Sequence, residues 1–157
     1  ELTFSRYLSS RGVETTPALV AYCNGTVEFL VSRAVAPAEP ADAWHLRQLA
    51  AGEDGRKAIQ RAIRQLAGMV GRMHAAGVIH RDLHCGNLLV RTDGAAPRLV
   101  LTDLHRMTRR RRLGRRVRAA NLAQLLHDRF ETTTRTERLR FLTHYLRASG
   151  ADGTRPS

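Results

Sequence analysis

The clearest periodic pattern of apolar side chains lies between residues 56 and 76. Five apolar residues recur there at steps of four, three, four and three: Ile59, Ile63, Leu66, Val70 and Met73. This spacing places them along one face of a helix. Gly77 follows the pattern, and glycine is common just after a helix ends. The pattern therefore predicts a long amphipathic helix that buries one face in a core.

Shorter patterns predict the other elements. Helical spacing indicates four further helices at residues 2–11, 43–51, 119–129 and 136–147. Apolar runs between turn residues indicate four strands at residues 18–22, 27–31, 88–90 and 99–102. Each pair of strands is joined by a turn rich in Gly, Asn, Asp or Pro, so two hairpins are expected.

The segments between these elements carry their own signals. Residues 35–40 contain two prolines and are expected to form a linker. Asp42 follows them at a position where it can cap the next helix. The polar tail at residues 149–157 is expected to be disordered.

The composition is strongly basic, with 26 Lys and Arg against 14 Asp and Glu and a formal net charge of +12. Lys57 is the only lysine, so nearly all of this charge is arginine. Positive charge favours anionic partners such as nucleic acid, phosphorylated sugars or an acidic membrane surface. A GC-rich genome also produces arginine-rich proteins, so the bias alone does not identify a ligand. Cys23 and Cys85 fit neither a disulfide framework nor a metal site, which favours a reducing, cytoplasmic setting.

Residues 80–87, HRDLHCGN, match the HRDLxxxN pattern of a kinase catalytic loop. A second acidic position, Asp103, follows in residues 102–105, where kinases carry Asp-Phe-Gly. The context of the loop also fits. The long predicted helix ends just before it, and a predicted hairpin starts just after it.

Strand geometry predicts that the polar residues of this segment meet. Asn87 directly precedes the first strand of the hairpin and Asp103 directly follows the second, so antiparallel pairing brings them side by side. Their oxygens suit Mg²⁺, which takes few protein ligands. Asp82 lies on the loop leading in and could accept the proton of an attacking hydroxyl. The alternative is that all three are ordinary turn and cap residues.

Two histidines of the loop receive different expectations. His80 is expected to pack and to brace the loop. His84 stands two residues after Asp82, where protein kinases carry Lys. It could act in catalysis, by bracing the loop or approaching the γ-phosphate of ATP, or it could be structural.

Residues 73–82, MHAAGVIHRD, resemble the helix and loop of the lipopolysaccharide core kinases, which phosphorylate heptose or Kdo sugars. Three later segments resemble the same family, at residues 102–106, 119–125 and 138–146. The resemblance covers nearly the whole chain. The catalytic loop is specific for the kinase-like superfamily, and the later segments are less specific for this family.

The resemblance implies an α+β fold, namely a mostly helical protein-kinase-like C-lobe with a partial N-lobe sheet. Residues 1–35 would be the N-lobe remnant, residues 36–148 the C-lobe and residues 149–157 the tail. Residues 31–35 would be the hinge, whose backbone groups could pair with the adenine of ATP, with Val31, Ser32 and Val35 as the candidate positions. Asn87 and Asp103 would complete the ATP site by binding Mg²⁺.

The chain departs from the family in two ways. Asn121 stands where the family usually has Asp, so the hydrogen bonding that braces the loop is expected to be weaker. No Gly-rich loop or strand lysine precedes the first helix, and Lys57 lies on the long helix instead. Glu1 is the nearest match to the N-lobe glutamate. We therefore expect a fragment or a degenerate copy that is inactive by itself.

The stretch from residue 106 to residue 118 is crowded with arginine. Five of these arginines follow the expected metal ligand and are predicted to hold the acceptor: Arg106, Arg109, Arg110, Arg111 and Arg112. Arginine suits bidentate binding of phosphate. The alternatives are a solvated basic loop or a nucleic-acid site. The latter is disfavoured because no aromatic residue alternates with these arginines.

The sequence thus predicts ATP-dependent phosphorylation of a sugar hydroxyl on a lipopolysaccharide-type, anionic glycolipid acceptor. Another small-molecule or Ser/Thr protein kinase is the alternative within enzymes. A pseudokinase that binds anionic partners is the alternative outside them. The expected location is the cytoplasm, with peripheral binding to the anionic inner face of a bacterial inner membrane as a further expectation.

Overall fold

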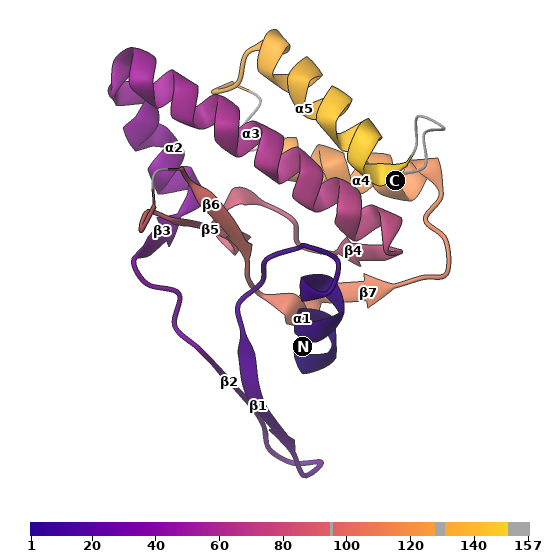
Figure 1. Cartoon of the computed structure of the whole chain (residues 1–157). Coiled ribbons are helices and arrows are strands. Elements are labelled where there is room, and N and C mark those ends of the chain that lie inside the picture. The colour runs from indigo at the N-terminus through magenta and orange to yellow at the C-terminus, as the bar shows by residue number, and fades with distance from the viewer. Residues whose placement is uncertain (95, 128–130, 151–157) are drawn as a thin grey trace.

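The computed structural model describes residues 1–94, 96–127 and 131–150, and within these ranges the chain is α+β (Figure 1). The helices are α1 (Leu2–Ser9), α2 (Ala41–Ala50), α3 (Gly52–Ala75), α4 (Arg115–His127) and α5 (Arg135–Ser149). The strands are β1 (Ala18–Cys23), β2 (Glu28–Ser32), β3 (Ala38–Pro40), β4 (Val78–His80), β5 (Leu88–Arg91), β6 (Arg98–Leu101) and β7 (Met107–Arg109). Two short 3-10 helices, η1 (Cys85–Asn87) and η2 (Leu104–Arg106), flank the β5–β6 hairpin.

Helix α3 is the longest of the described helices, and α5 packs along it (Figure 1). The apolar face of α3 is buried as the periodicity predicts, with Ile59, Val70 and Met73 at 2% exposure or less. The two helices approach closely at Gly71, where a Cβ atom would lie 2.6 Å from the Cβ of Ala148. Gly77 has a φ of +77° and ends the helix, as expected.

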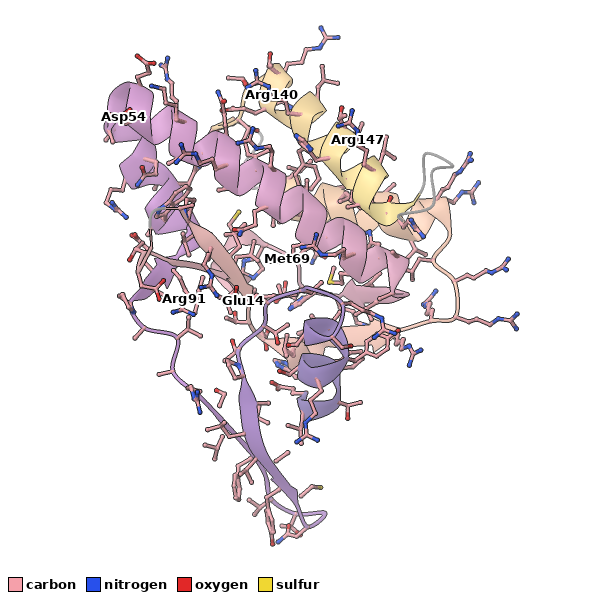
Figure 2. The ribbon with its side chains drawn as sticks, viewed as in Figure 1. Glu14, Asp54, Met69, Arg91, Arg140 and Arg147 are labelled. Carbon is pink, nitrogen blue, oxygen red and sulfur yellow. The ribbon has the colours of Figure 1, made fainter. Side chains whose placement is uncertain are left out.

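The strands form three small sheets. The predicted hairpin β5–β6 pairs Leu88 with Leu101, and β3 adds an edge strand to β5. The segment before β1 pairs in parallel with the end of β6 at Thr15 and Leu101, and Leu101 donates its N–H to Glu14 O. Glu14 and Arg91 lie side by side there (Figure 2), with 3.7 Å between Oε1 and Nη1.

The hairpin β1–β2 extends away from the helices (Figure 1). Its apolar side chains are exposed, including Val20 at 53% and Phe29 at 50%. Tyr22 and Phe29 stack on this surface with ring centroids 5.1 Å apart. This hairpin therefore leaves apolar side chains exposed to solvent.

Several local predictions are wrong. The expected linker at 35–40 contains strand β3, because pairing with β5 outweighs the turn signal of its prolines. Asp42 lies inside α2 and not before it, although its Oδ1 still accepts the N–H of Ala43. Helix α4 begins at Arg115, earlier than expected, since arginine is a good helix former.

The C-terminal helix extends further than the sequence predicts. Ser149 belongs to α5 and not to the tail, and it is only 6% exposed. Residues 151–157 of the tail, and residues 128–130 at the expected end of α4, lie outside the described ranges. Within those ranges, every helix is too short or too polar to serve as a membrane span.

Candidate active site

The predicted site residues Asp82, Asn87 and Asp103 meet at one end of the β5–β6 hairpin. The N–H and the Oγ1 of Thr102 both donate to Asn87 O, each at 3.0 Å, so strand pairing continues to the residue before Asp103. Asn87 Nδ2 donates to the backbone oxygen of Asp82 at 2.8 Å. These hydrogen bonds therefore hold the backbone of Asp82, Asn87 and Thr102 together, and Asp103 follows directly after Thr102.

Asp103 is the non-glycine residue with positive φ in the described ranges, at φ 56° and ψ 47°. Asp tolerates this left-handed conformation better than most residues. The turn sends the chain from β6 into η2, which brings His105 Nδ1 into contact with Asp103 Oδ1. The same Nδ1 is 3.7 Å from Glu1 Oε1. His105 thus lies between two carboxylates, an arrangement that sequence spacing does not reveal.

The side-chain oxygen atoms of Asn87 and Asp103 suit Mg²⁺ as ligands. Asn87 Nδ2 donates to the loop, which leaves its Oδ1 as an acceptor, and Asp103 supplies carboxylate oxygens at the same end of the hairpin. No group of three or more His, Cys, Asp or Glu in the described part of the chain could hold a metal ion. Two oxygen ligands are enough for Mg²⁺, because it keeps several waters and takes the rest from phosphates.

His80 braces this end of the hairpin, as predicted. Its Nδ1 accepts the N–H of Asp82 at 3.2 Å, and its Nε2 lies 3.2 Å from Thr102 O. A carbonyl oxygen can only accept, so Nε2 carries the proton. Burial lowers the pKa of His80 and favours this neutral form, although the bond to Thr102 opposes the shift.

A buried hydrogen-bonded chain supports the loop from behind. Asn121 Nδ2 donates to His80 O at 2.6 Å, and its Oδ1 is 3.0 Å from His74 Nε2. His74 Nδ1 is 2.8 Å from the hydroxyl of Tyr145. Since His80 O can only accept, the amide must face His74 with its oxygen, so Nε2 donates and Nδ1 accepts from Tyr145. Helices α5, α3 and α4 are thereby linked to the loop.

This geometry corrects the expectation that Asn121 weakens the brace. An aspartate at this position could not donate to His80 O, whereas the asparagine does so while still accepting from His74. Gln124, one turn later, adds a bond from Nε2 to Arg81 O at 2.9 Å. The bonds of His74 are not visible in the sequence, because periodicity shows that a side chain is buried but not what it bonds.

The buried network predicts that stability falls in acid. Burial lowers the pKa of His74 below its ordinary 6.5, with the bond to Asn121 opposing and Arg118 adding to the shift. In the unfolded chain the group takes up a proton at a higher pH than in the folded chain, so stability is full above the ordinary pKa and is lost below it. Urea unfolding should show a lower midpoint at about pH 5.5 than at about pH 7.5.

His74→Gln provides the check on this assignment. The variant should be less stable than the wild type at neutral pH and should lose less stability on acidification, with a residual slope from His80. His144→Gln on α5, which lies outside this hydrogen-bonded chain, is the matched control. An unchanged slope in His74→Gln would show that His74 is not the titrating group.

Two cavities flank the site. The first, of about 290 Å³, runs from Asp103 and Glu1 to the predicted hinge, where Ser32 and Val35 line it. Val31 is not among its lining residues, and its side chain is 46% exposed, since side chains alternate along β2. Leu30 and Leu89, which the sequence reading missed, contribute apolar surface to this cavity.

The backbone of the hinge also faces the first cavity. The N–H of Arg33 donates to Pro17 O at 2.9 Å. In the described part of the chain, the N–H and C=O groups of Ala34 and Val35 make no hydrogen bond. Both residues line the cavity, so their backbone N–H and C=O groups are available to a ligand.

The second cavity, of about 580 Å³, opens on the other side of the loop and contains Asp82 and His84. Helix α4 supplies its far wall with Gln124 and His127, one turn apart. His84 Nδ1 accepts the N–H of Gly86 at 3.0 Å, and its Nε2 is 3.8 Å from Asp82 Oδ2. The structure therefore brings both predicted catalytic residues into one cavity. His127 was not predicted, since it lies beyond the recognised motifs.

The predicted arginines are placed differently. Arg81 donates its N–H to Arg106 O at 2.9 Å, so Arg106 still lies beside the loop. Strand β7 then runs antiparallel to β4 and carries the chain away from Asp82. Arg109, Arg110 and Arg111 line a separate hollow, and Arg112 is exposed. The structure does not bring these four into the cavity with Asp82.

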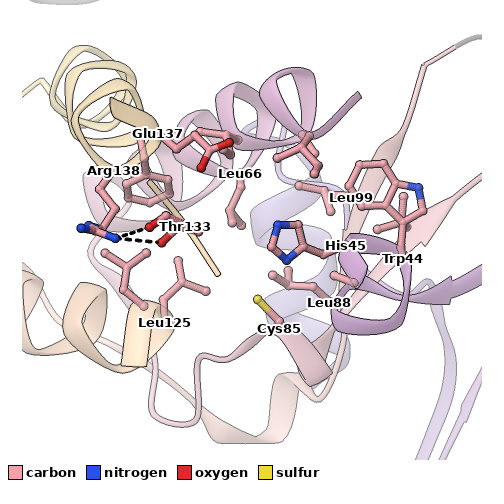
Figure 3. A pocket seen from close by; sticks show the side chains of 17 residues that line it. Trp44, His45, Leu66, Cys85, Leu88, Leu99, Leu125, Thr133, Glu137 and Arg138 are labelled. Carbon is pink, nitrogen blue, oxygen red and sulfur yellow. Dashed lines mark hydrogen bonds between the residues drawn. The ribbon is translucent and has the colours of Figure 1, made fainter. Parts of the chain in front are cut away.

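A third, apolar cavity of about 90 Å³ lies between α2, α3, α4, α5 and the β5–β6 hairpin (Figure 3). Trp44, Leu66, Leu99 and Leu125 are among its lining residues. Arg138 donates to Thr133 at one side (Figure 3). None of Asp82, Asn87 or Asp103 lines this cavity, so it is not part of the polar site.

Comparison with known proteins agrees with this geometry. Residues 1–145 match the model of a protein family described as "Lipopolysaccharide kinase (Kdo/WaaP) family". The chain belongs to this family. The lipopolysaccharide core heptose(I) kinase WaaP of Pseudomonas aeruginosa is 39% identical over 90 residues, which are 54% of this chain and 34% of that protein.

A solved structure of WaaP in complex with acyl carrier protein has the same fold, with a TM-score of 0.79. The sequences are 30% identical, and the match covers 92% of this chain and 64% of that chain. The chain thus spans about a third of the curated family member and less than two thirds of the solved one.

Proposed function

We propose that the protein carrying this chain is an ATP-dependent kinase that phosphorylates a sugar hydroxyl of a lipopolysaccharide-type acceptor. One observation carries the proposal: the hydrogen bonds of Asn87 tie the loop of Asp82, which lines one cavity, to Thr102, which lines another cavity together with Asp103. The cavity containing Asp103 would hold the phosphoryl donor, and the cavity containing Asp82 would hold the acceptor. Family membership supports this assignment.

In the donor cavity, the adenine of ATP would pair with the backbone groups of Ala34 and Val35. Leu30 and Leu89 would contact its faces. Asn87 and Asp103 would hold Mg²⁺, which neutralises charge on the phosphates. On this proposal residues 36–148 are a kinase-like C-lobe, and residues 1–35 belong to the N-lobe.

In the acceptor cavity, Asp82 would orient the attacking hydroxyl and accept its proton, which places negative charge on the oxygen that forms the new bond to phosphorus. His84 would hold the Asp82 carboxylate in place, since its Nε2 is within 4 Å of it. Gln124 and His127 would bind hydroxyl groups of the sugar. The heptose in the name of the curated relative makes a core heptose the first acceptor to test.

The proposed cellular setting follows from the acceptor. A glycolipid acceptor is bound to a membrane, so we propose a cytoplasmic protein that contacts the anionic inner face of the inner membrane. The net charge of +12 supports such a contact.

Transfer of labelled phosphate tests the proposal. The longest form of the protein that its gene encodes should transfer the γ-phosphate of ATP to lipopolysaccharide from a strain that lacks inner-core phosphate. Transfer should require Mg²⁺. Label on protein substrates but not on lipopolysaccharide would favour a protein kinase, and nucleotide binding with no transfer to any acceptor would favour a pseudokinase.

A further inference from the structure

An open hollow of about 580 Å³ lies where the ends of α1 and α3 meet strand β7. We call it the arginine hollow; its lining residues are Tyr7, Arg11, Ala75, Ala76, Arg109, Arg110 and Arg111. It shares no residue with the two cavities that flank Asp82 and Asp103. Four cationic side chains thus converge on one concave surface.

The backbone that presents these arginines is held in place by bonds independent of any ligand. Arg109 is paired with Val78 in the β4–β7 ladder, and Arg110 donates its N–H to Gly77 O at 2.8 Å. A Cβ at Gly77 would lie 2.2 Å from Arg110 O, so only glycine permits this approach. The Tyr7 hydroxyl donates to Ala76 O at 3.0 Å and fixes the ring between the elements.

The ring of Tyr7 gathers two of the cations. The guanidinium carbon of Arg11 lies 3.7 Å from the ring centroid, and that of Arg109 lies 4.3 Å from it. The two positive charges therefore lie against the same ring and close to each other. Stacking uses the face of a guanidinium and leaves N–H donors free in its plane.

Nothing in the described ranges neutralises this charge. No ion pair there involves Arg11, Arg109, Arg110 or Arg111. The side chains of Arg109, Arg110 and Arg111 also make no hydrogen bond within those ranges. Four like charges on a fixed concave surface repel one another, and a bound anion of two charges would relieve that repulsion.

We propose that the arginine hollow is a binding site for a phosphate group, carried either by a soluble phosphate ester or by a phospholipid headgroup. Arg109, Arg110 and Arg111 then bind a ligand away from Asp82 and not the hydroxyl that is phosphorylated. Because β7 leads away from the loop, a phosphate held here leaves the cavity beside Asp82 open. The inference does not depend on kinase activity.

Binding of inorganic phosphate tests the site directly. The shift of the thermal midpoint is measured in sodium phosphate against sodium chloride of equal ionic strength, for the wild type, R109Q/R110Q and the control R61Q/R64Q. The control removes the same charge from the exposed outer side of α3. We expect R109Q/R110Q to bind phosphate roughly tenfold more weakly or worse, and the control to match the wild type. Phosphate bound in the nucleotide cavity contributes equally to all three proteins.

A second arm identifies the source of the phosphate. Sedimentation with phosphatidylglycerol vesicles, against phosphatidylcholine vesicles, should fall in R109Q/R110Q if headgroups occupy the hollow. Unchanged sedimentation with weakened phosphate binding would assign it to soluble esters. R110Q/R111Q leaves the Tyr7 stack intact and repeats the test if R109Q/R110Q unfolds. Equal phosphate binding and equal sedimentation in the folded variants and the control would overturn the proposal.

Discussion

Replacing Asp82 with Asn is expected to lower kcat of the proposed transfer by roughly 10²–10⁴-fold and to leave the affinity for ATP nearly unchanged. The side chain lines the acceptor cavity with His84, and it does not line the cavity that would hold the nucleotide. Asn preserves its size but cannot accept the proton of the hydroxyl. Steady-state transfer at saturating acceptor, together with equilibrium ATP binding, separates the two effects.

The substitution should not disturb the loop, because Asn87 bonds to the backbone oxygen of Asp82 and not to its carboxylate. Asp93→Asn is the matched control: it removes a carboxylate from the turn at the opposite end of the β5–β6 hairpin and should behave like the wild type. Undiminished turnover in Asp82→Asn would refute its role as the base. A parallel loss of ATP affinity would place it in the nucleotide site instead.

The part of the site that follows from strand pairing could be predicted from the sequence. Asn87 and Asp103 bracket two apolar runs, and pairing of those runs puts the two residues at one end whatever surrounds the hairpin. The long helix was equally predictable, because its periodicity records which side is buried. The role of His80 as a brace followed from its place in the loop, and the structure confirms it.

The parts that depend on long-range pairing could not be predicted. Strand β7 is only three residues long and sits among arginines, so no local pattern indicates a strand. Its pairing with β4 comes from tertiary packing, and that pairing decides where Arg109, Arg110 and Arg111 lie. Their position directly after Asp103 in the sequence suggested nearness to the acceptor, whereas the direction of β7 takes them elsewhere.

Side-chain networks were the second gap. Asn121, His74 and Tyr145 come from three helices that are far apart in the sequence, and none of their spacings marks a hydrogen-bonded chain. Likewise, the place of Val31 in the sequence suggests the hinge but does not show which way its side chain faces. That face of β2 depends on the register of the hairpin, which composition does not determine.

Replacing Asp103 with Asn is expected to abolish the Mg²⁺-dependent part of ATP binding. With Mg²⁺ present, the affinity should fall by roughly tenfold or more, while the affinity in EDTA should stay the same. Asn suits the test because it accepts the left-handed conformation at this position, so the turn into η2 is preserved. It also keeps an oxygen for the contact with His105. Only the negative charge is removed.

The two substitutions are therefore expected to differ in one measurement, the Mg²⁺ dependence of ATP binding. Asp82→Asn should keep the Mg²⁺ dependence of ATP binding and lose turnover, whereas Asp103→Asn should lose both. His105→Gln is the control for the second variant, because it removes the group that contacts Asp103 and keeps the carboxylate. It should retain the gain in affinity from Mg²⁺. If Asp103→Asn retained that gain as well, the metal would have to be held by residues other than Asn87 and Asp103, and the division into a donor and an acceptor cavity would lose its physical basis.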